Sequence, residues 1–233
     1  NGIGHCQPVN DSGVLGKMGI SNTELSRLLK AKTPGTSLVN KLKISYRPYI
    51  CPFDELLEKI PIGASVYDMG CGSGMFLMLV SEYRKPAKLG GAEVSLALIE
   101  NARALLRGFT GPIQLSVFDG QNIPPEISEF DFITLIDVLH HVPVLYQEKF
   151  LRDICTKLKN GATLIIKDID AKSPLHYFNK MHDLLLAGEI GNEWSFERMH
   201  DFIVSLGMTV EYQSKRRMIV YPHFTLLCVK RSQ

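Results

Sequence analysis

The sequence predicts an α/β fold built on a doubly wound parallel sheet, and three observations carry that prediction. Residues 66–76 read as a buried strand that breaks into a glycine-rich loop and continues as a helix. Strand-like apolar runs then alternate with helix-like segments, as in a series of strand–helix–strand units. Acidic residues follow several of these runs, at the edge where open α/β sheets bind their ligands. We therefore expect a ligand site at the carboxyl ends of the strands.

The loop after the first strand carries glycines at positions 70, 72 and 74 and follows Asp68. Glycine lets the main chain turn sharply and approach a ligand closely. The helix that begins at Met75 offers free N–H groups to an anion such as a carboxylate. Met75 occupies the position where a dinucleotide fingerprint needs its third glycine. The loop thus favours a small-molecule cofactor over a dinucleotide, and a plain turn without any ligand is the alternative.

The second strand is expected at residues 87–94, and Glu93 near its end lies 21 positions after Gly72. An acidic residue about 20 positions beyond a glycine loop binds ribose hydroxyls in nucleotide-binding folds. A carboxylate suits this role because it accepts hydrogen bonds from two hydroxyls at once. The spacing therefore predicts that Glu93 binds a ribose. The alternative is a solvated charge at a strand end, a role that would not require this spacing.

The later elements continue the alternation. Ser95 is a typical N-cap for the second helix, and Asn160-Gly161 ends the third. A turn at residues 221–223 would separate two β-rich runs near the C-terminus. The third and fourth strands end at Asp119 and Asp137. In chain order the expected elements are helix 75–80, helix 95–106, strand 113–118, strand 130–137, helix 143–159, strand 162–167, helix 196–206, strand 208–213 and strand 224–230.

The pattern Asp-x-Gly-x-Gly-x-Gly at residues 68–74, followed by the hexapeptide at residues 137–142, resembles motifs of the class I S-adenosylmethionine-dependent methyltransferases. The resemblance covers roughly residues 60–231. It implies a Rossmann-like sheet of seven strands, in which the last strand inserts antiparallel between the fifth and the sixth.

Applied to this chain, the resemblance implies a site for S-adenosylmethionine and its product S-adenosylhomocysteine. Residues 70–72 would line the methionine part, with Asp68 near the cofactor's amino group. Asp119 would accept from the adenine amino group, and the main chain at Asp137 would pass beneath the transferable methyl. The expected cofactor-binding residues are Tyr46, Arg47, Asp68, Gly70, Cys71, Gly72, Gly74, Glu93, Val94, Asp119, Gly120, Gln121 and Asp137.

Residues 1–60 are expected to form an N-terminal helical cap in front of a methyltransferase domain at residues 61–233. Residues 21–24 read as a capping box that starts a helix. In related enzymes such a leader folds over the cofactor, so Tyr46 and Arg47 are candidates to meet its carboxylate. The alternative roles are a packing tyrosine and a solvated arginine.

Residues 168–194 are expected to be an insertion after the fifth strand, which in the resembled family generally covers the acceptor pocket. The short segments 47–52 and 181–185 also resemble bacterial methyltransferases of aryl polyene and related lipid-like pathways. These two segments therefore point to a small or lipid-like acceptor.

Methyl transfer from a sulfonium needs mainly an aligned acceptor, and a hydroxyl acceptor also benefits from a base with a pKa near neutrality. Histidine meets that requirement, so His141 and His182 are the candidate catalytic residues, with a structural role as the alternative. His140 is expected to face away or to pack beneath the loop. No metal is expected, because the five cysteines show no metal-ligand spacing.

Composition fits one large α/β domain, with 233 residues of which 45% are hydrophobic. A net charge of +2 is too mild to favour nucleic acid as an obligatory partner. The cysteine pattern is typical of reduced thiols in a cytoplasmic protein. No apolar run reaches the length of a membrane span, and nothing at the start reads as a signal peptide. The sequence leaves the oligomeric state open.

The expected function is methyl transfer to a small or lipid-like acceptor, with oxygen as the methylated atom. A nicotinamide oxidoreductase is disfavoured by Met75. An RNA methyltransferase is an alternative, although residues 137–140 replace the Asn-Pro-Pro-Tyr type of motif used for exocyclic amines, and a non-catalytic cofactor-binding protein is another. Seven basic residues between Lys17 and Arg47 face the single acid Glu24. They form either a solvated helix face or a surface that attracts an anionic, carrier-bound acceptor.

Overall fold

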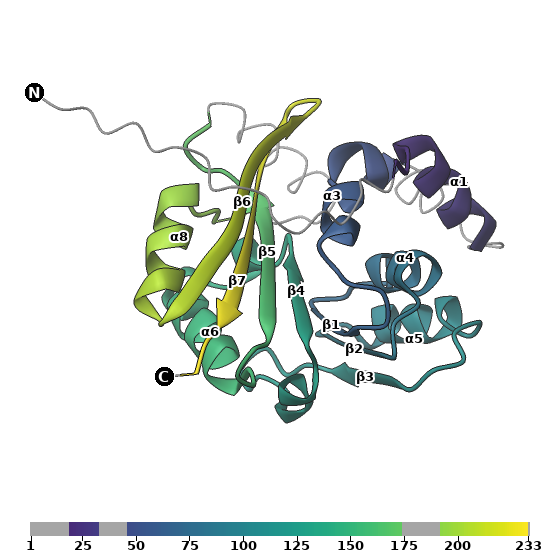
Figure 1. Ribbon diagram of the computed structural model, residues 1–233, viewed down its shortest axis with the longest axis horizontal. Coiled ribbons are helices and arrows are strands. Elements are labelled where there is room, and N and C mark those ends of the chain that lie inside the picture. Colours follow the sequence, from purple (N-terminus) through teal and green to yellow (C-terminus); the bar gives the residue numbers. More distant parts are fainter. Residues whose placement is uncertain (1–18, 33–45, 174–191, 233) are drawn as a thin grey trace, which may run out of the picture.

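The structure is a computed structural model, and it describes residues 19–32, 46–173 and 192–232 (Figure 1). Within these residues seven strands form one sheet: β1 (Ser65–Met69), β2 (Lys88–Glu93), β3 (Ile113–Val117), β4 (Phe132–Ile136), β5 (Thr163–Ile169), β6 (Met208–Met218) and β7 (Tyr221–Lys230). The strand order is β3-β2-β1-β4-β5-β7-β6. The first five strands pair in parallel, and β7 runs antiparallel to both β5 and β6. This confirms the predicted doubly wound, seven-stranded sheet with its last strand inserted antiparallel.

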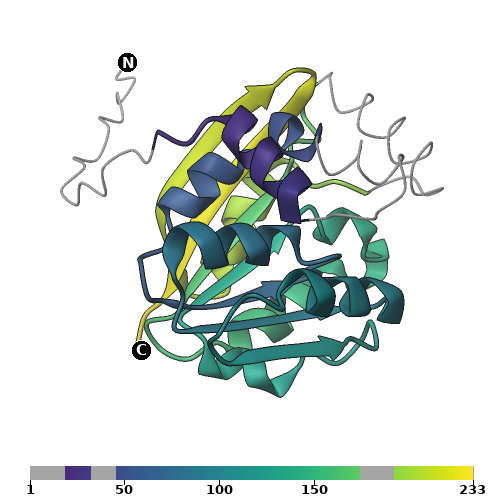
Figure 2. The ribbon, with the colours of Figure 1, turned by 90° about the vertical axis from the view of Figure 1, so that its right-hand side faces the viewer.

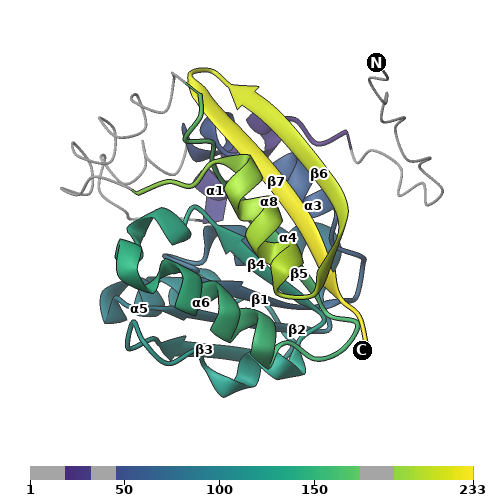
Figure 3. The ribbon, with the colours of Figure 1, turned by 90° about the vertical axis from the view of Figure 1, so that its left-hand side faces the viewer.

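Helices cover both faces of the sheet. They are α1 (Asn22–Lys32), α3 (Phe53–Glu58), α4 (Met75–Arg84), α5 (Leu96–Leu105), α6 (Val144–Lys157) and α8 (Phe196–Ser205), with short 3₁₀ turns η1 (Pro125–Glu129) and η2 (Leu139–His141). One face carries α4 and α5, with α1 and α3 packed on α4 (Figure 2). The opposite face carries α6 and α8 (Figure 3). This two-sided cover buries the parallel strands, as expected for such a sheet.

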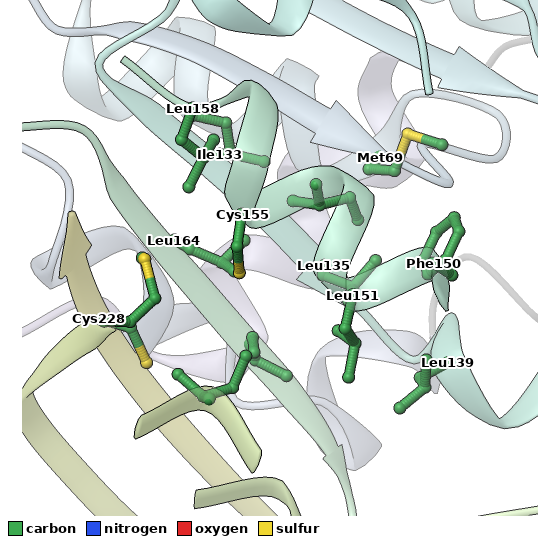
Figure 4. Packing of buried hydrophobic residues seen from close by; sticks show 14 of the residues in the cluster. Met69, Ile133, Leu135, Leu139, Phe150, Leu151, Cys155, Leu158, Leu164 and Cys228 are labelled. Carbon is green, nitrogen blue, oxygen red and sulfur yellow. The ribbon is translucent and has the colours of Figure 1, made fainter. Parts of the chain in front are cut away.

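Side chains that alternate along β1 divide the core into two clusters. Val66 packs with α4 on one face, whereas Tyr67 and Met69 pack with α6 on the other. Figure 4 shows the α6 cluster, in which apolar side chains of α6 interdigitate with those of β4 and β5. The labelled side chains there include Phe150, Leu151, Cys155, Leu158, Ile133, Leu135 and Leu164. Burial on both faces holds the strand ends, and therefore the loops that follow them, in fixed positions.

The C-terminal hairpin differs from the sequence prediction. The chain reverses at Ile219, whose φ is +57°, so the turn predicted at residues 221–223 was wrong. Those residues begin β7, which pairs with β5 and with β6 from its first residues. Pro222 is compatible with this position because it lies at the start of the strand, where its missing N–H disrupts least. Its carbonyl accepts from the Asp170 N–H at 2.8 Å.

The fifth strand is also longer than predicted. It runs to Ile169 rather than Lys167, because β7 pairs with it along its whole length up to His223. The segment proposed as an insertion at residues 168–194 therefore begins inside the strand.

The described part of the N-terminal cap packs on the domain. α1 starts with the predicted capping box, in which the Glu24 N–H donates to Ser21 Oγ at 3.2 Å and the Ser21 N–H donates to Glu24 Oε2 at 2.8 Å. α3 lies beside the β6–β7 hairpin (Figure 1), where Asp54 pairs with Arg216 at 2.9 Å. Across the described residues, no helix has the length and apolar character needed to cross a membrane.

Candidate functional site

The glycine loop is attached to the end of β2 by its main chain. The N–H groups of Gly70 and Cys71 both donate to the Ala92 carbonyl, at 2.8 and 3.0 Å. The loop closes on itself where the Gly74 N–H donates to the Cys71 carbonyl at 2.9 Å. These bonds fix the loop at the carboxyl edge of the sheet, between β1 and α4.

The three glycines serve different physical needs. All have positive φ angles, +79° at Gly70, +53° at Gly72 and +78° at Gly74, a region that other L residues adopt only at a cost. A Cβ atom at Gly70 would lie 2.4 Å from a methyl of Val138, and one at Gly74 would lie 2.9 Å from Ala102 Cβ. A Cβ at Gly72 would meet nothing within 4 Å. Gly70 and Gly74 thus permit close packing, whereas Gly72 borders open space that a cofactor fits.

Glu93 lies at the end of β2 and holds the middle of the loop. Its Oε2 accepts from the Gly72 N–H at 3.1 Å, and its Oε1 accepts from the Ser95 N–H at 3.2 Å. Each carboxylate oxygen has two lone pairs, so both oxygens keep acceptor capacity for ribose hydroxyls. The next residue, Val94, is 61% exposed and offers apolar surface beside that carboxylate.

Asp119 follows β3 and organises its own loop. Its Oδ1 accepts from the N–H groups of Gln121 and Asn122 at 2.8 and 2.7 Å, while its Oδ2 accepts from the Asn122 side-chain amide at 2.7 Å. The hydrogen bonds from Asn122, the largest influence, lower the pKa of Asp119. Gly120, with φ of +81°, supplies the left-handed turn. An ionised acceptor thus stands at the third strand end, where the resemblance expects the adenine.

Asp68 is buried in β1, two residues before Gly70 of the loop. Its Oδ1 accepts from the Thr134 hydroxyl at 2.6 Å. Burial raises the pKa of Asp68 to about 7, which the Thr134 hydrogen bond only partly offsets. Asp68 is therefore poised between its neutral and charged forms near physiological pH, and a cationic amine beside it would favour the charged form. Sequence reasoning missed Thr134, whose pairing depends on the register between β1 and β4.

Asp137 joins the cap to the sheet. Its Oδ2 pairs with Arg47 Nη2 at 2.8 Å, and its Oδ1 pairs with Lys167 Nζ at 2.5 Å. Burial alone would raise the pKa of Asp137, but Lys167 and Arg47 outweigh it and hold that pKa well below its usual range. Tyr46, beside Arg47, is 42% exposed. Sequence reasoning missed Lys167, although a lysine directly after the apolar run 164–166 was a usable signal.

The two histidines of η2 have different surroundings. His140 is buried, and its Nδ1 lies 2.7 Å from Asp168 Oδ1. His141 is exposed, and its ring lies 4.1 Å from that of His140, centroid to centroid. Asp168 therefore orients His140, and the His141 ring lies against it at an interplanar angle of 49°. The third histidine of the prediction, His182, lies outside the described residues.

Gln147 connects this turn to the chain beyond residue 191. Its side-chain amide donates to the carbonyls of Leu139 and Asn192 at 3.0 and 2.9 Å, and its Oε1 accepts from Trp194 Nε1 at 2.6 Å. The Asn192 N–H in turn donates to the His140 carbonyl at 3.0 Å. Residues 192–194 are thus held against the histidine turn. Sequence reasoning missed Gln147, which reads as an ordinary polar residue of a surface helix.

Thiol and metal chemistry have little support in the described part of the chain. Its four cysteines are buried and unpaired, and burial raises the pKa of the Cys71 thiol. No group of three or more potential metal ligands occurs among the residues that the structure describes. In the described residues, the groups available to a ligand are the glycine loop, the carboxylates and the histidines along the carboxyl edge of the sheet.

Comparisons with known proteins agree with this geometry. A family model described as a methyltransferase domain matches residues 44–211. The carboxy-S-adenosyl-L-methionine synthase of Campylobacter curvus is 28% identical over 115 residues, which are 49% of this chain and 48% of that protein. The tRNA (carboxymethyluridine(34)-5-O)-methyltransferase of Saccharomyces cerevisiae is 31% identical over 113 residues, 48% of this chain and 38% of that one. The chain thus spans about half, or less, of the length of these curated relatives.

Solved structures show the same fold at lower identity. The mitomycin 7-O-methyltransferase MmcR superposes with a TM-score of 0.66 and 20% identity, covering 88% of this chain and 60% of that one. This likeness concerns the fold alone.

Proposed function

Because this chain belongs to the family of methyltransferase domains, we propose that it transfers the methyl group of S-adenosylmethionine to an oxygen atom of a small or lipid-like acceptor. The observation that carries the proposal is the joint geometry of the loop and its neighbouring strand end. Gly72 borders open space, and the carboxylate of Glu93 holds the Gly72 N–H at 3.1 Å. A cofactor bound over Gly72 would therefore also contact Glu93.

The other expected residues extend this cofactor site along the sheet edge. Asp119 is the acceptor for the adenine amino group, with Gly120 and Gln121 shaping its loop, and Val94 is apolar surface beside the ribose. Asp68 lies on the methionine side of the loop, where its pKa of about 7 suits an interaction with the cofactor's amino group. Tyr46 and Arg47 remain the candidates for the cofactor's carboxylate.

The reaction asks the protein mainly for alignment. When bound, the cofactor supplies an electrophilic methyl on its sulfonium. The main chain at Asp137, fixed by the N–H bond from Asp137 to the Lys167 carbonyl at 2.9 Å, is the floor beneath the position of the methyl. An acceptor hydroxyl loses its proton during transfer, so a base nearby accelerates the step.

The η2 turn provides the base in this proposal. His141 is exposed and its ring centroid lies 4.1 Å from that of His140, while Asp168 pairs with His140 at 2.7 Å. A carboxylate that accepts from one ring nitrogen fixes the tautomer and orientation of an imidazole, as in a catalytic triad. We assign proton removal to His141, with His140 and Asp168 as its support, and His182 remains a second candidate.

Acceptor choice is assigned to the segments around this turn. Both described ends of residues 168–194 contact the histidine turn, since Asp168 pairs with His140 and the Asn192 carbonyl accepts from Gln147. This supports the proposal that the insertion selects the acceptor. The basic leader residues between Lys17 and Arg47 favour an anionic, carrier-bound acceptor by raising its encounter rate.

Calorimetry on three forms of the protein tests the cofactor site. Wild type should bind S-adenosylhomocysteine and not NAD. Gly72→Asn should abolish binding, because its side chain fills the open space, and asparagine tolerates positive φ better than most residues. Gly161→Asn is the matched control, since Gly161 also has positive φ (+82°) and open space but lies before β5, at the opposite edge.

Retained affinity in a folded Gly72→Asn variant would contradict the assignment of the loop. Binding of NAD in place of S-adenosylhomocysteine by the wild type would instead support the oxidoreductase alternative.

RNA is a second candidate acceptor, because one relative with 31% identity is a tRNA methyltransferase. Its discriminating assay is incorporation of tritiated methyl from S-adenosylmethionine into bulk tRNA, measured beside hydroxylated small molecules and lipids. Label in tRNA alone would replace the small-acceptor proposal.

A further inference from the structure

Lys167 is a buried charge that the proposed mechanism does not yet use. It lies in β5 between Ile136 of β4 and Thr225 of β7, and its side chain is 0% exposed. Taking an ammonium out of water costs several kcal/mol unless a partner offsets it. A hydrophobic residue would fill this central position without that cost, so the retained charge calls for an explanation.

Its partner carboxylate bridges two cations. Asp137 accepts from Lys167 on one oxygen and from Arg47 on the other, at 2.5 and 2.8 Å. The Asp137 main chain is also fixed by Lys167, through the bond from its N–H to the Lys167 carbonyl at 2.9 Å. Asp137 has a φ of +53°, which is unusual for a residue other than glycine. Lys167 therefore contacts both the backbone and the side chain of Asp137.

The three charged groups of this set differ in how far they are exposed. Lys167 is fully buried and the Asp137 side chain is 13% exposed, whereas the Arg47 side chain is 32% exposed. Arg47 comes from the cap and the other two come from adjacent strand ends. Arg47 is therefore the most exposed of the three groups, at the carboxyl edge where the cofactor is proposed to bind.

Two of the neighbouring titratable groups carry no charge. Burial, and to a lesser extent the nearby charge of Lys167, lowers the pKa of His223 to about 3, so this imidazole is neutral. Burial raises the pKa of the Cys51 thiol to about 11, so the thiol is neutral as well. The buried His140 pairs with Asp168 at 2.7 Å.

We propose that Lys167 is a positioning residue for anion recognition: through Asp137 it fixes the Arg47 guanidinium at the carboxyl edge, where Arg47 binds the carboxylate of the cofactor's amino-acid part. This inference rests on the proposed function, and it adds a residue that touches no ligand itself. A guanidinium suits the role because its planar donor fork matches a carboxylate. The contrasting role is structural, in which Lys167 only neutralises Asp137.

Two ligands separate these roles by calorimetry. S-adenosylhomocysteine carries the amino-acid part, whereas 5′-methylthioadenosine keeps the adenosine and the thioether but lacks the carboxylate and the amine. Lys167→Met removes the charge at similar length. It should weaken the binding of S-adenosylhomocysteine at least about 10-fold, as for a lost hydrogen bond to a charged group. The affinity for methylthioadenosine should stay within about twofold of the wild-type value.

The sign of the change identifies the ligand group. Loss of a positive charge from the protein strengthens the binding of an ammonium and weakens that of a carboxylate. A selective fall in the affinity for S-adenosylhomocysteine therefore indicates that the protein recognises the ligand's carboxylate. Arg47→Gln should show the same selectivity, because it removes the contact itself. An unchanged methylthioadenosine affinity is the internal control for folding.

Equal effects on the two ligands, or no effect on either, would overturn the positioning role. If Lys167→Met does not fold, the double variant Lys167→Met/Asp137→Asn removes the buried pair together, and a wild-type ratio of the two affinities in it would also overturn the role. Failure of the wild type to bind either ligand would instead refute the proposed function.

Discussion

At the scale of single residues, the site combines groups with opposite electrostatic settings. Asp68 and Asp137 are both buried near the loop, yet their pKa values move in opposite directions. Asp68 has a hydroxyl as its partner and suffers mainly from desolvation, whereas Asp137 has two cations. Because of this difference, the charge of Asp68 can respond to a cationic ligand, whereas Asp137 stays charged and supports its two cationic partners.

Asp68 makes the stability of the protein depend on pH. Its folded pKa of about 7 lies above the value of about 3.9 in an unfolded chain. Between these values the folded state holds a proton that the unfolded state releases, so the stability contributed by Asp68 falls as pH rises from about 4 to 7. Asp68→Asn keeps the acceptor for Thr134 and removes the titration. Its free energy of unfolding relative to wild type should rise by about 1–3 kcal/mol between pH 5 and 8.

Urea denaturation at several pH values measures this difference. Asp119→Asn is the control, because the pKa of Asp119 is lowered and its effect should stay constant above pH 5. A difference between wild type and Asp68→Asn that is independent of pH would show that Asp68 is ionised in the folded protein throughout this range.

His141 carries the acid–base prediction. With a hydroxyl acceptor, His141→Gln should lower kcat about 100-fold to 10,000-fold, the range for loss of general base catalysis, while S-adenosylhomocysteine affinity stays unchanged. The wild-type rate should rise with pH as the imidazole loses its proton. His200→Gln is the matched control, since His200 is a partly exposed histidine of α8. Full activity in both His141→Gln and His182→Gln would leave alignment as the whole mechanism.

At the scale of elements, the sequence predicted what local patterns determine. Ser95 acts as the predicted N-cap through a hydrogen bond from the Leu98 N–H, and α4 begins directly after the glycine loop. Strand ends that carry Asp68, Glu93 and Asp119 also follow from residue spacing. These features depend on neighbours in the chain, so the sequence displays them.

Features set by pairing between distant strands were harder to predict. The length of β5 and the place of the hairpin turn both follow from the register of β7, which a local pattern at residues 221–223 does not contain. Lys167, Thr134 and Gln147 acquire their roles in the same way, from partners 30, 66 and 45 residues away. Their types alone are compatible with many environments.

At the scale of the whole molecule, the carboxyl edge of the sheet carries the described groups of the proposed site. The loop after β1, Glu93 after β2, Asp119 after β3, Asp137 after β4 and Lys167 in β5 lie at consecutive strand ends in the order β3-β2-β1-β4-β5. Helices on both faces hold these ends through two apolar clusters. The opposite edge carries the tight turn at Gly161, which is the control position for Gly72.

Amide hydrogen exchange with and without saturating S-adenosylhomocysteine tests the central claim most directly, because it reports which backbone segments the ligand covers. Exchange should slow at residues 70–74, 93–95 and 119–122, and should stay unchanged at residues 159–163 on the opposite edge. Slower exchange confined to other segments, or no change at saturation, would contradict a cofactor site at the carboxyl edge of the sheet.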